Sequence, residues 1–299
     1  MTANQRYFLV GIGGPGMMPL AMILAGRGAS VAGSDRSLDQ GRVPAKFDAL
    51  RALGVTLHPQ DGSGITAPDQ IVVASAAVEE TVADLVTATR LGCPRLTRAE
   101  LNARLFNASA LQIGVAGTSG KSTVTGMIAA ILHAAGGDPT VMKGAVMKDF
   151  ASADRPFASA LVGRGDAYVS EVDESDGSIA LYAPRIAVLN NVSLDHKSLE
   201  ELNRLFAAFI GKAAHAIVNI DNPDAAALAL ALPRDRVTRF AIDRAADLQA
   251  TDVVEEPFAA SFSLGGTRVR LAVPGRHNVA NALAAIGAAL AAGIPLDQA

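Results

Sequence analysis

Short apolar runs alternate along the chain with longer segments in which apolar positions recur every three or four residues. In the first hundred residues, the runs that predict strands lie at 6–13, 30–35 and 70–77. The segments that predict helices lie at 19–28, 47–54 and 79–92, and each ends at a glycine. Strands that alternate with helices in this way are typical of βαβ units and a parallel sheet.

A second series of the same kind follows the segment "FNASA" at 106–110. Buried strands are predicted within 111–117, 167–175, 185–196 and 213–225. The last forty residues add strand-like positions at 261–273 and a final helix after "PGRHN". The pattern therefore predicts two α/β domains, at residues 1–108 and 109–299.

Composition agrees with two domains built on aliphatic cores. The chain has 299 residues, which is enough for two domains of ordinary size. Half of the residues are hydrophobic, only 4% are aromatic and tryptophan is absent, so Ala, Val, Leu and Ile must fill the interior. Such a mixture suits an α/β protein.

Charge and cysteine content limit the classes of binding partner and the cellular compartment that we expect for the protein. The formal net charge is -3 with both signs interspersed, so we expect no nucleic-acid partner. Cys93 is the single cysteine, which fits a reducing compartment. The N-terminus lacks a signal-peptide pattern and the alanine-rich run at 279–293 is too short to cross a bilayer, so we expect a soluble, cytoplasmic protein without membrane contact.

The segment "GTSGKST" joins a predicted strand to a predicted apolar helix. A glycine turn at a helix N-terminus directs backbone N–H groups at an anion, and Lys121 adds a full positive charge. Ser122 is placed to offer its hydroxyl to a magnesium ion. The standard loop spacing would have glycine where this chain has Val115, so the match is incomplete. The residues predicted to hold nucleotide phosphates are Gly117, Thr118, Ser119, Gly120, Lys121, Ser122 and Thr123.

Carboxylates follow the next predicted strand, as a magnesium-triphosphate site requires. The segment "SEVDESDGS" at 170–178 carries four of them, although charge at this density is more often a solvated loop. The segment "NNVSLDH" places Asp195 and His196 after another strand. Hard cations prefer oxygen ligands, and a neutral imidazole can join them at a second metal.

The N-terminal segment "GIGGPG" satisfies a dinucleotide-binding fingerprint through Gly11, Gly13 and Gly16. Asp35 follows on the next predicted strand, at the distance of a ribose-binding acid. Taken alone, this pattern predicts a nicotinamide-dependent oxidoreductase. That alternative requires two separate nucleotide sites in the chain, and nothing in the sequence resembles a hydride-transfer constellation.

Four segments, "GTSGKST", "SEVDESD", "NNVSLDH" and "PGRHNVANALAA", resemble the Mur ligase family of ATP-dependent amide ligases in order and approximate spacing. The segments "GIGGPGMMPLA", "GSD" and "VVASAAV" are most similar to the alanine-adding members. The resemblance implies an α/β fold with an N-terminal Rossmann-like, doubly wound parallel-sheet domain that binds a UDP-sugar. A P-loop-type α/β central domain that binds ATP would follow.

The resemblance also implies roles for individual residues. Lys121 would hold ATP phosphates, Ser122 and Glu171 would bind one Mg²⁺, His196 would serve a second Mg²⁺, and Asn191 would line the same pocket. The residues expected beside the adenine are His277, Asn278 and Asn281. The residues expected to bind the UDP-sugar are Gly11, Gly13, Gly14, Gly16 and Asp35, with Ser75 near the uracil.

The implied reaction joins an amino acid, with L-alanine expected, to the carboxylate of UDP-N-acetylmuramate through an acyl phosphate in peptidoglycan precursor synthesis. The family has a third, C-terminal domain that is expected to begin where this chain ends. The chain is therefore expected to be a protein cut at a domain boundary, or a two-domain relative that relies on a partner protein. Two further alternatives are a recycling ligase that adds a preformed peptide and a non-catalytic nucleotide-binding scaffold.

Overall fold

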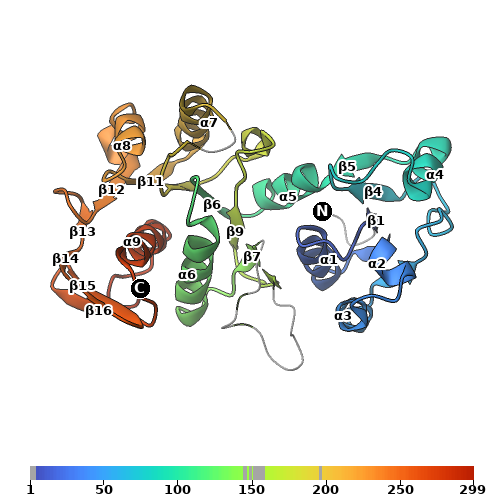
Figure 1. Ribbon diagram of the computed structural model, residues 1–299, viewed down its shortest axis with the longest axis horizontal. Coiled ribbons are helices and arrows are strands. Elements are labelled where there is room, and N and C mark those ends of the chain that lie inside the picture. The colour runs from blue at the N-terminus through green and yellow to red at the C-terminus, as the bar shows by residue number, and fades with distance from the viewer. Residues whose placement is uncertain (1–4, 144–146, 148–149, 151–158, 195–196) are drawn as a thin grey trace. The chain divides into compact units, whose positions relative to one another are not determined.

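The computed structural model describes residues 5–143, 147, 150, 159–194 and 197–299 (Figure 1). These residues form two compact units, each with its own sheet. The first unit comprises Met1–Ala108 and Thr140–Gly163, and the second comprises Ser109–Pro139 and Arg164–Ala299. The chain changes unit after residue 108, where the sequence predicts a domain boundary, but Thr140–Gly163 is counted with the first unit.

The first unit is a parallel sheet in the order β3-β2-β1-β4-β5. Its strands are β1 (Arg6–Val10), β2 (Ser30–Ser34), β3 (Thr56–His58), β4 (Ile71–Ala74) and β5 (Arg95–Thr97). Its helices are α1 (Met17–Gly26), α2 (Arg36–Asp39), α3 (Pro44–Ala52), α4 (Ala83–Leu91) and α5 (Arg98–Asn107). The strand order reverses between β1 and β4, and the carboxyl ends of strands at such a reversal form the usual ligand crevice.

Apolar side chains bury the sheet of the first unit. Phe8 and Val10 of β1 and Val72 of β4 pack with Leu85 of α4 and with Cys93 in a buried cluster. Tyr7 to Val10 are all buried, as expected for a central strand of a parallel sheet covered by helices. The continuous apolar run that predicted this strand therefore reflects burial on both faces.

The second unit contains parallel strands in the order β13-β12-β11-β10-β6-β9. These strands are β6 (Leu111–Ala116), β9 (Ala167–Glu171), β10 (Ile186–Leu189), β11 (His215–Asn219), β12 (Val237–Ala241) and β13 (Leu248–Gln249). The helices are α6 (Lys121–Ala134), α7 (Leu199–Lys212), α8 (Pro223–Leu230) and α9 (Arg276–Ala291), with the 3₁₀ helices η2 (Ser178–Leu181) and η3 (Arg234–Arg236). Helices α6 and α9 lie side by side, and α7 packs beside α8 (Figure 1).

Two smaller strand groups complete the structure. Strands β14 (Thr251–Glu256), β15 (Ala259–Leu264) and β16 (Thr267–Leu271) form an antiparallel sheet. Strands β7 (Thr140–Met142) and β8 (Ala160–Leu161) pair antiparallel. The strand-like positions at 261–273 thus belong to a separate sheet, which the sequence did not predict.

The predicted α/β fold class is confirmed. The helix expected from residue 79 begins at Ala83, because Glu79 to Val82 form turns before it. The three-residue strands β3 and β5 were not predicted. Within the part of the chain that the structure describes, no helix is long and apolar enough to cross a membrane.

Candidate nucleotide-binding sites

The segment "GTSGKST" forms the turn between β6 and α6, as the sequence predicts. Gly117 and Gly120 have φ values of 131° and 84°, which favour glycine, and α6 begins at Lys121. The residues that line a hollow of about 240 Å³ here are Thr118, Ser119, Gly120, Lys121, Ser122 and Thr123. The first N–H groups of a helix have no partner within the helix, so this hollow suits an anion.

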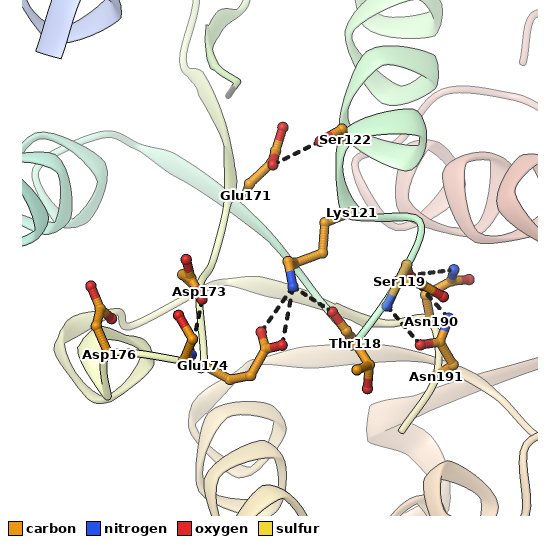
Figure 2. Close-up of polar contacts among 12 residues, drawn as sticks. Thr118, Ser119, Lys121, Ser122, Glu171, Asp173, Glu174, Asp176, Asn190 and Asn191 are labelled. Atoms are coloured by element: carbon orange, nitrogen blue, oxygen red, sulfur yellow. Dashed lines mark hydrogen bonds and ion pairs between the residues drawn. The ribbon is translucent and has the colours of Figure 1, made fainter. Parts of the chain in front are cut away.

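The Lys121 ammonium lies between the loop and the acidic segment after β9 (Figure 2). Its Nζ donates to the Gly117 carbonyl at 2.8 Å and to both Glu174 carboxylate oxygens at 2.9 and 3.1 Å. The Lys121 side chain is 19% exposed and that of Glu174 is 6% exposed, so this ion pair is largely shielded from water. The lysine is therefore held close to the loop by protein groups.

Ser122 and Glu171 lie together at the start of α6 and the end of β9 (Figure 2). The Ser122 Oγ donates to Glu171 Oε2 at 2.9 Å. A hydroxyl and a carboxylate at this separation are oxygen donors of the kind that Mg²⁺ prefers. The described residues contain no group of three or more His, Cys, Asp or Glu that could hold a metal without other ligands. A magnesium ion here would need phosphate or water oxygens as well.

Asn191, which follows β10, fixes the shape of the loop. Its Oδ1 accepts from the Ser119 N–H at 2.9 Å, and its Nδ2 donates to the Ser119 carbonyl at 3.0 Å. The Asn191 carbonyl accepts from the Thr118 N–H at 3.2 Å. The sequence predicted Asn191 at this pocket, and the structure shows it bonded to the loop backbone.

A second asparagine connects the loop to α9. Asn190 Nδ2 donates to the Ser119 carbonyl at 3.2 Å and to Asn281 Oδ1 at 3.0 Å. Asn281 Nδ2 in turn donates to Asn278 Oδ1 at 3.2 Å, and both Asn190 and Asn281 are buried. Asn281, the last of the residues expected beside the adenine, is therefore joined to the loop through Asn190. The side chain of His277 is exposed.

In the first unit, the predicted glycine turn lies between β1 and α1. Gly11 has a φ of 75°. The Gly13 N–H donates to Asp35 Oδ2 at 2.8 Å, and the Asp35 Oδ1 accepts from the Ser37 N–H at 2.8 Å. Asp35, which is 8% exposed, thus fastens the turn to the end of β2. Lys46 Nζ donates to the Gly13 carbonyl at 2.8 Å.

Ser75 lies after β4, where it lines a hollow of about 500 Å³ in the first unit. Its other walls include Val78 and Leu85, together with a bidentate ion pair between Arg95 and Glu80 at 2.7 and 2.8 Å. The hydrogen bond from Arg95 lowers the pKa of Glu80. An apolar hollow with fixed polar groups is typical of a small-molecule site.

The structure brings to these sites several residues that the sequence pattern did not single out. Glu174 was only one of four acidic positions in its segment, and nothing in the pattern distinguished it. Asn190 adjoins the predicted Asn191 but was not singled out. Arg98, at the start of α5, lies against Gly16, because a Cβ added at Gly16 would be 2.6 Å from its Cδ. His196 lies outside the described residues.

Two family models match nearly the whole chain. The model described as "Mur ligase family, catalytic domain" matches residues 6–110, and "Mur ligase middle domain" matches residues 115–289. A UDP-N-acetylmuramate--L-alanine ligase from Streptomyces coelicolor is 38% identical across 99% of this chain and 64% of its own length. A protein of the same name from Chlorobaculum tepidum is 37% identical across 99% of this chain and 62% of its length.

Solved structures show the same fold. A UDP-N-acetylmuramate-alanine ligase from Thermotoga maritima has a TM-score of 0.81 at 23% identity, covering 98% of this chain and 66% of that one. A murein peptide ligase from Psychrobacter arcticus has a TM-score of 0.83 at 24% identity, with coverages of 98% and 66%. The chain spans about 64% of the length of the first relative named above. Since the middle-domain match alone covers more than half of the sequence and contains the loop at Lys121, the chain belongs to the Mur ligase family.

Proposed function

We propose that the chain binds the two nucleotide substrates of an ATP-dependent ligase that joins L-alanine to the carboxylate of UDP-N-acetylmuramate. The observation that carries the proposal is the loop at Lys121, with Ser122 hydrogen-bonded to Glu171, in a chain of this family. The relatives at 33–38% identity are named as L-alanine ligases of this substrate, which supports the choice of amino acid.

The second unit is the proposed ATP site. The first-turn N–H groups of α6 and the ammonium of Lys121 would hold the phosphates, and the loop glycines let the backbone approach them. The buried amides of Asn190 and Asn281 adjoin the loop, which supports placing the nucleoside toward Asn278 and His277 at the start of α9.

Ser122 and Glu171 are the proposed Mg²⁺ ligands. Their oxygens are 2.9 Å apart and lie on the same side of the loop (Figure 2). Mg²⁺ is commonly bound through one or two protein oxygens with phosphates and water completing its coordination, so this small donor set fits. The ion would stabilise negative charge on the reacting phosphate oxygens.

The first unit is the proposed UDP-sugar site. The turn at Gly11, Gly13, Gly14 and Gly16 lies at the carboxyl end of β1, where the strand order reverses, and α1 has no acidic residue in its first turn. A diphosphate is favoured at such a helix N-terminus. Ser75 lines the adjacent hollow at the end of β4, which supports a base-binding role there. Asp35 would act by holding the turn.

The reaction requires activation of a carboxylate before an amine can attack it. ATP would supply the phosphoryl group that converts the muramoyl carboxylate to an acyl phosphate, from which the amino acid displaces phosphate. The residues of this chain would contribute by aligning the phosphates and neutralising charge, which are the main sources of catalysis in phosphoryl transfer.

A preformed peptide is the second candidate for the incoming amine. A structural relative from Neisseria meningitides, named as a ligase of UDP-N-acetylmuramate and L-alanyl-gamma-D-glutamyl-meso-diaminopimelate, has a TM-score of 0.81 at 25% identity. It covers 98% of this chain and 95% of that chain. The names of the sequence relatives favour L-alanine. The comparisons do not favour the nicotinamide-dependent oxidoreductase.

Calorimetric titration tests the proposal. Wild-type protein should bind UDP-N-acetylmuramate and, with magnesium, a non-hydrolysable ATP analogue, but not NAD. The variant Lys121→Ala should lose binding of the analogue and retain binding of the UDP-sugar, because the two sites lie in different units. Loss of both ligands in this folded variant would contradict the two-site assignment, and binding of NAD in place of the UDP-sugar would favour the oxidoreductase.

A further inference from the structure

Every donor of the Lys121 ammonium is engaged by the protein itself. An ammonium carries three N–H groups, and Nζ has three acceptors, namely the Gly117 carbonyl and the two oxygens of Glu174. All three distances lie between 2.8 and 3.1 Å. In this arrangement, the lysine that would bind phosphate has no donor left for it.

Glu174 reaches Lys121 from a loop in which Asp173 and Asp176 each accept a hydrogen bond from a nearby backbone N–H (Figure 2). Asp173 Oδ1 accepts from the Ser175 N–H at 2.9 Å, and Asp176 Oδ1 accepts from the Ser178 N–H at 2.8 Å. Glu174 instead extends to the start of α6 and is 6% exposed. Its buried carboxylate is an internal anion placed at the lysine.

A nucleotide phosphate and Glu174 would compete for the same cation. Phosphate oxygens carry negative charge, and placing them beside a shielded carboxylate is unfavourable at low local dielectric. Removing one partner of a buried ion pair also leaves the other charge uncompensated. When Lys121 turns to phosphate, Glu174 must therefore leave its position or take another cation.

We propose that Glu174 is a positioning residue that holds Lys121 in a closed arrangement in which its donors are occupied, and that ATP binds by displacing Glu174. The inference rests on the proposed function, because it assumes that the loop binds ATP. The apparent affinity of a ligand falls in proportion to the fraction of protein in the competent state, so the ion pair weakens ATP binding.

The ion pair also connects nucleotide binding to movement of the acidic segment. Glu174 follows the proposed metal ligand Glu171 by three positions and lies just beyond the end of β9. The backbone of Glu174 is part of the turn that ends at Gly177, whose N–H donates to the Glu174 carbonyl at 3.3 Å. Phosphate binding at Lys121 would thus change the position of the Glu174 side chain, in the segment that follows the proposed metal ligand Glu171.

The variant Glu174→Gln tests this role because it removes the charge and preserves the size of the side chain. Titration with a non-hydrolysable ATP analogue and magnesium should show affinity about tenfold tighter than wild type, equivalent to a competent fraction near one tenth in wild type. The nucleotide-free variant should unfold at a lower temperature. A merely structural role would lower both stability and affinity.

Asp176→Asn is the matched control, since it removes one negative charge from the same loop and keeps an acceptor for Ser178. Its affinity for the analogue should stay within about twofold of wild type, because no hydrogen bond or ion pair joins Asp176 to Lys121 among the described residues. Equal tightening in both variants would attribute the effect to general electrostatics and overturn the proposal. Unchanged or weaker binding by Glu174→Gln would also overturn it.

Glu174→Asp provides a second variant should Glu174→Gln not fold. The shorter side chain keeps the charge but withdraws the carboxylate from Nζ, so binding should again be tighter than in wild type; unchanged or weaker binding would overturn the proposal. Wild-type protein that binds no analogue would contradict the proposed function and this inference together. Wild-type binding with no gain in either variant would contradict only the role of Glu174.

Discussion

Gly120 shows at the scale of one residue why the loop requires glycine. Its φ of 84° is in the left-handed region, and a Cβ at this position would be 2.7 Å from Asn281 Oδ1 and still closer to the Asn190 amide. Gly136, after α6, has a φ of 79°, but no atom lies within 4 Å of the Cβ position. The two glycines share the backbone constraint and differ in their surroundings.

Gly120→Ala should therefore destabilise the protein more than Gly136→Ala. We expect a loss of about 1–2 kcal/mol in the free energy of unfolding for Gly136→Ala from backbone strain alone. Crowding against the asparagines should add about 1–3 kcal/mol for Gly120→Ala. Urea denaturation measures both, and only Gly120→Ala should weaken binding of the ATP analogue. Equal losses in the two variants would mean that the asparagines move aside freely.

The sequence correctly predicted a turn between a strand and a helix at Gly117, Gly120 and Lys121. The role of these residues in binding phosphate stays a prediction. The partner of Lys121 could not be predicted, because the direction of Glu174 depends on how its loop packs beside α6. Four acidic residues in one short segment look alike in the sequence, and only tertiary structure distinguishes them.

Asp84 connects the helix α4 to the strand β2 and to the loop after β3. Its carboxylate accepts hydrogen bonds from the Ser34 hydroxyl and, at 2.9 Å, from the Gly62 N–H. The side chain is fully buried. Burial raises the pKa of Asp84 above its usual value, with the two hydrogen bonds opposing that change.

The raised pKa of Asp84 determines the direction in which the free energy of unfolding changes with pH. Between the unfolded value of 3.8 and the higher folded pKa, the folded state holds the proton more strongly than the unfolded chain does. The free energy of unfolding should therefore fall as pH rises through this window, as far as Asp84 is concerned. At higher pH, the contribution is constant because the carboxylate is ionised in both states.

Asp84→Asn should remove this contribution, because an amide does not titrate and its oxygen can still accept from Gly62. As pH rises from about 4, the free energy of unfolding of the variant should increase relative to that of wild type, and this difference should then become constant. Urea denaturation across pH 4 to 7 measures the shift. Asp48→Asn, at an exposed position of α3, serves as the control. Parallel profiles for Asp84→Asn and wild type would contradict the assignment.

The buried strand β1 and the apolar helix α6 were predicted from the sequence, whereas the helices α5 and α7 and the shortest strands were not. A five-residue buried strand such as β1, or the periodic helix α6, extends over enough positions to show its pattern. Strands β3 and β5 have three residues each, which is too few for a repeat to be recognised. The antiparallel sheet of β14, β15 and β16 was missed as a sheet because strand pairing is not encoded in the apolar pattern alone.

At the scale of the whole molecule, each proposed nucleotide site lies within one unit that has its own sheet. The glycine turn at Gly11 follows a strand of the first unit, and the loop at Lys121 follows a strand of the second. A ligand stabilises the structure to which it binds according to its concentration relative to its dissociation constant. The two nucleotides should therefore protect different sets of amides from hydrogen exchange.

UDP-N-acetylmuramate should slow exchange in β1 and α1, and the ATP analogue with magnesium should slow exchange in β6 and α6. At a ligand concentration of 100 times the dissociation constant, the added stability is about 2.7 kcal/mol, or roughly a hundredfold slowing for amides that exchange through opening of the bound unit. Mass spectrometry of peptides from 6–26 and 111–134 measures both effects in one sample. Lys121→Ala should lose only the second. Equal protection of both peptides by either nucleotide would show that the units open together, because a ligand can protect a distant segment only if both exchange through the same opening.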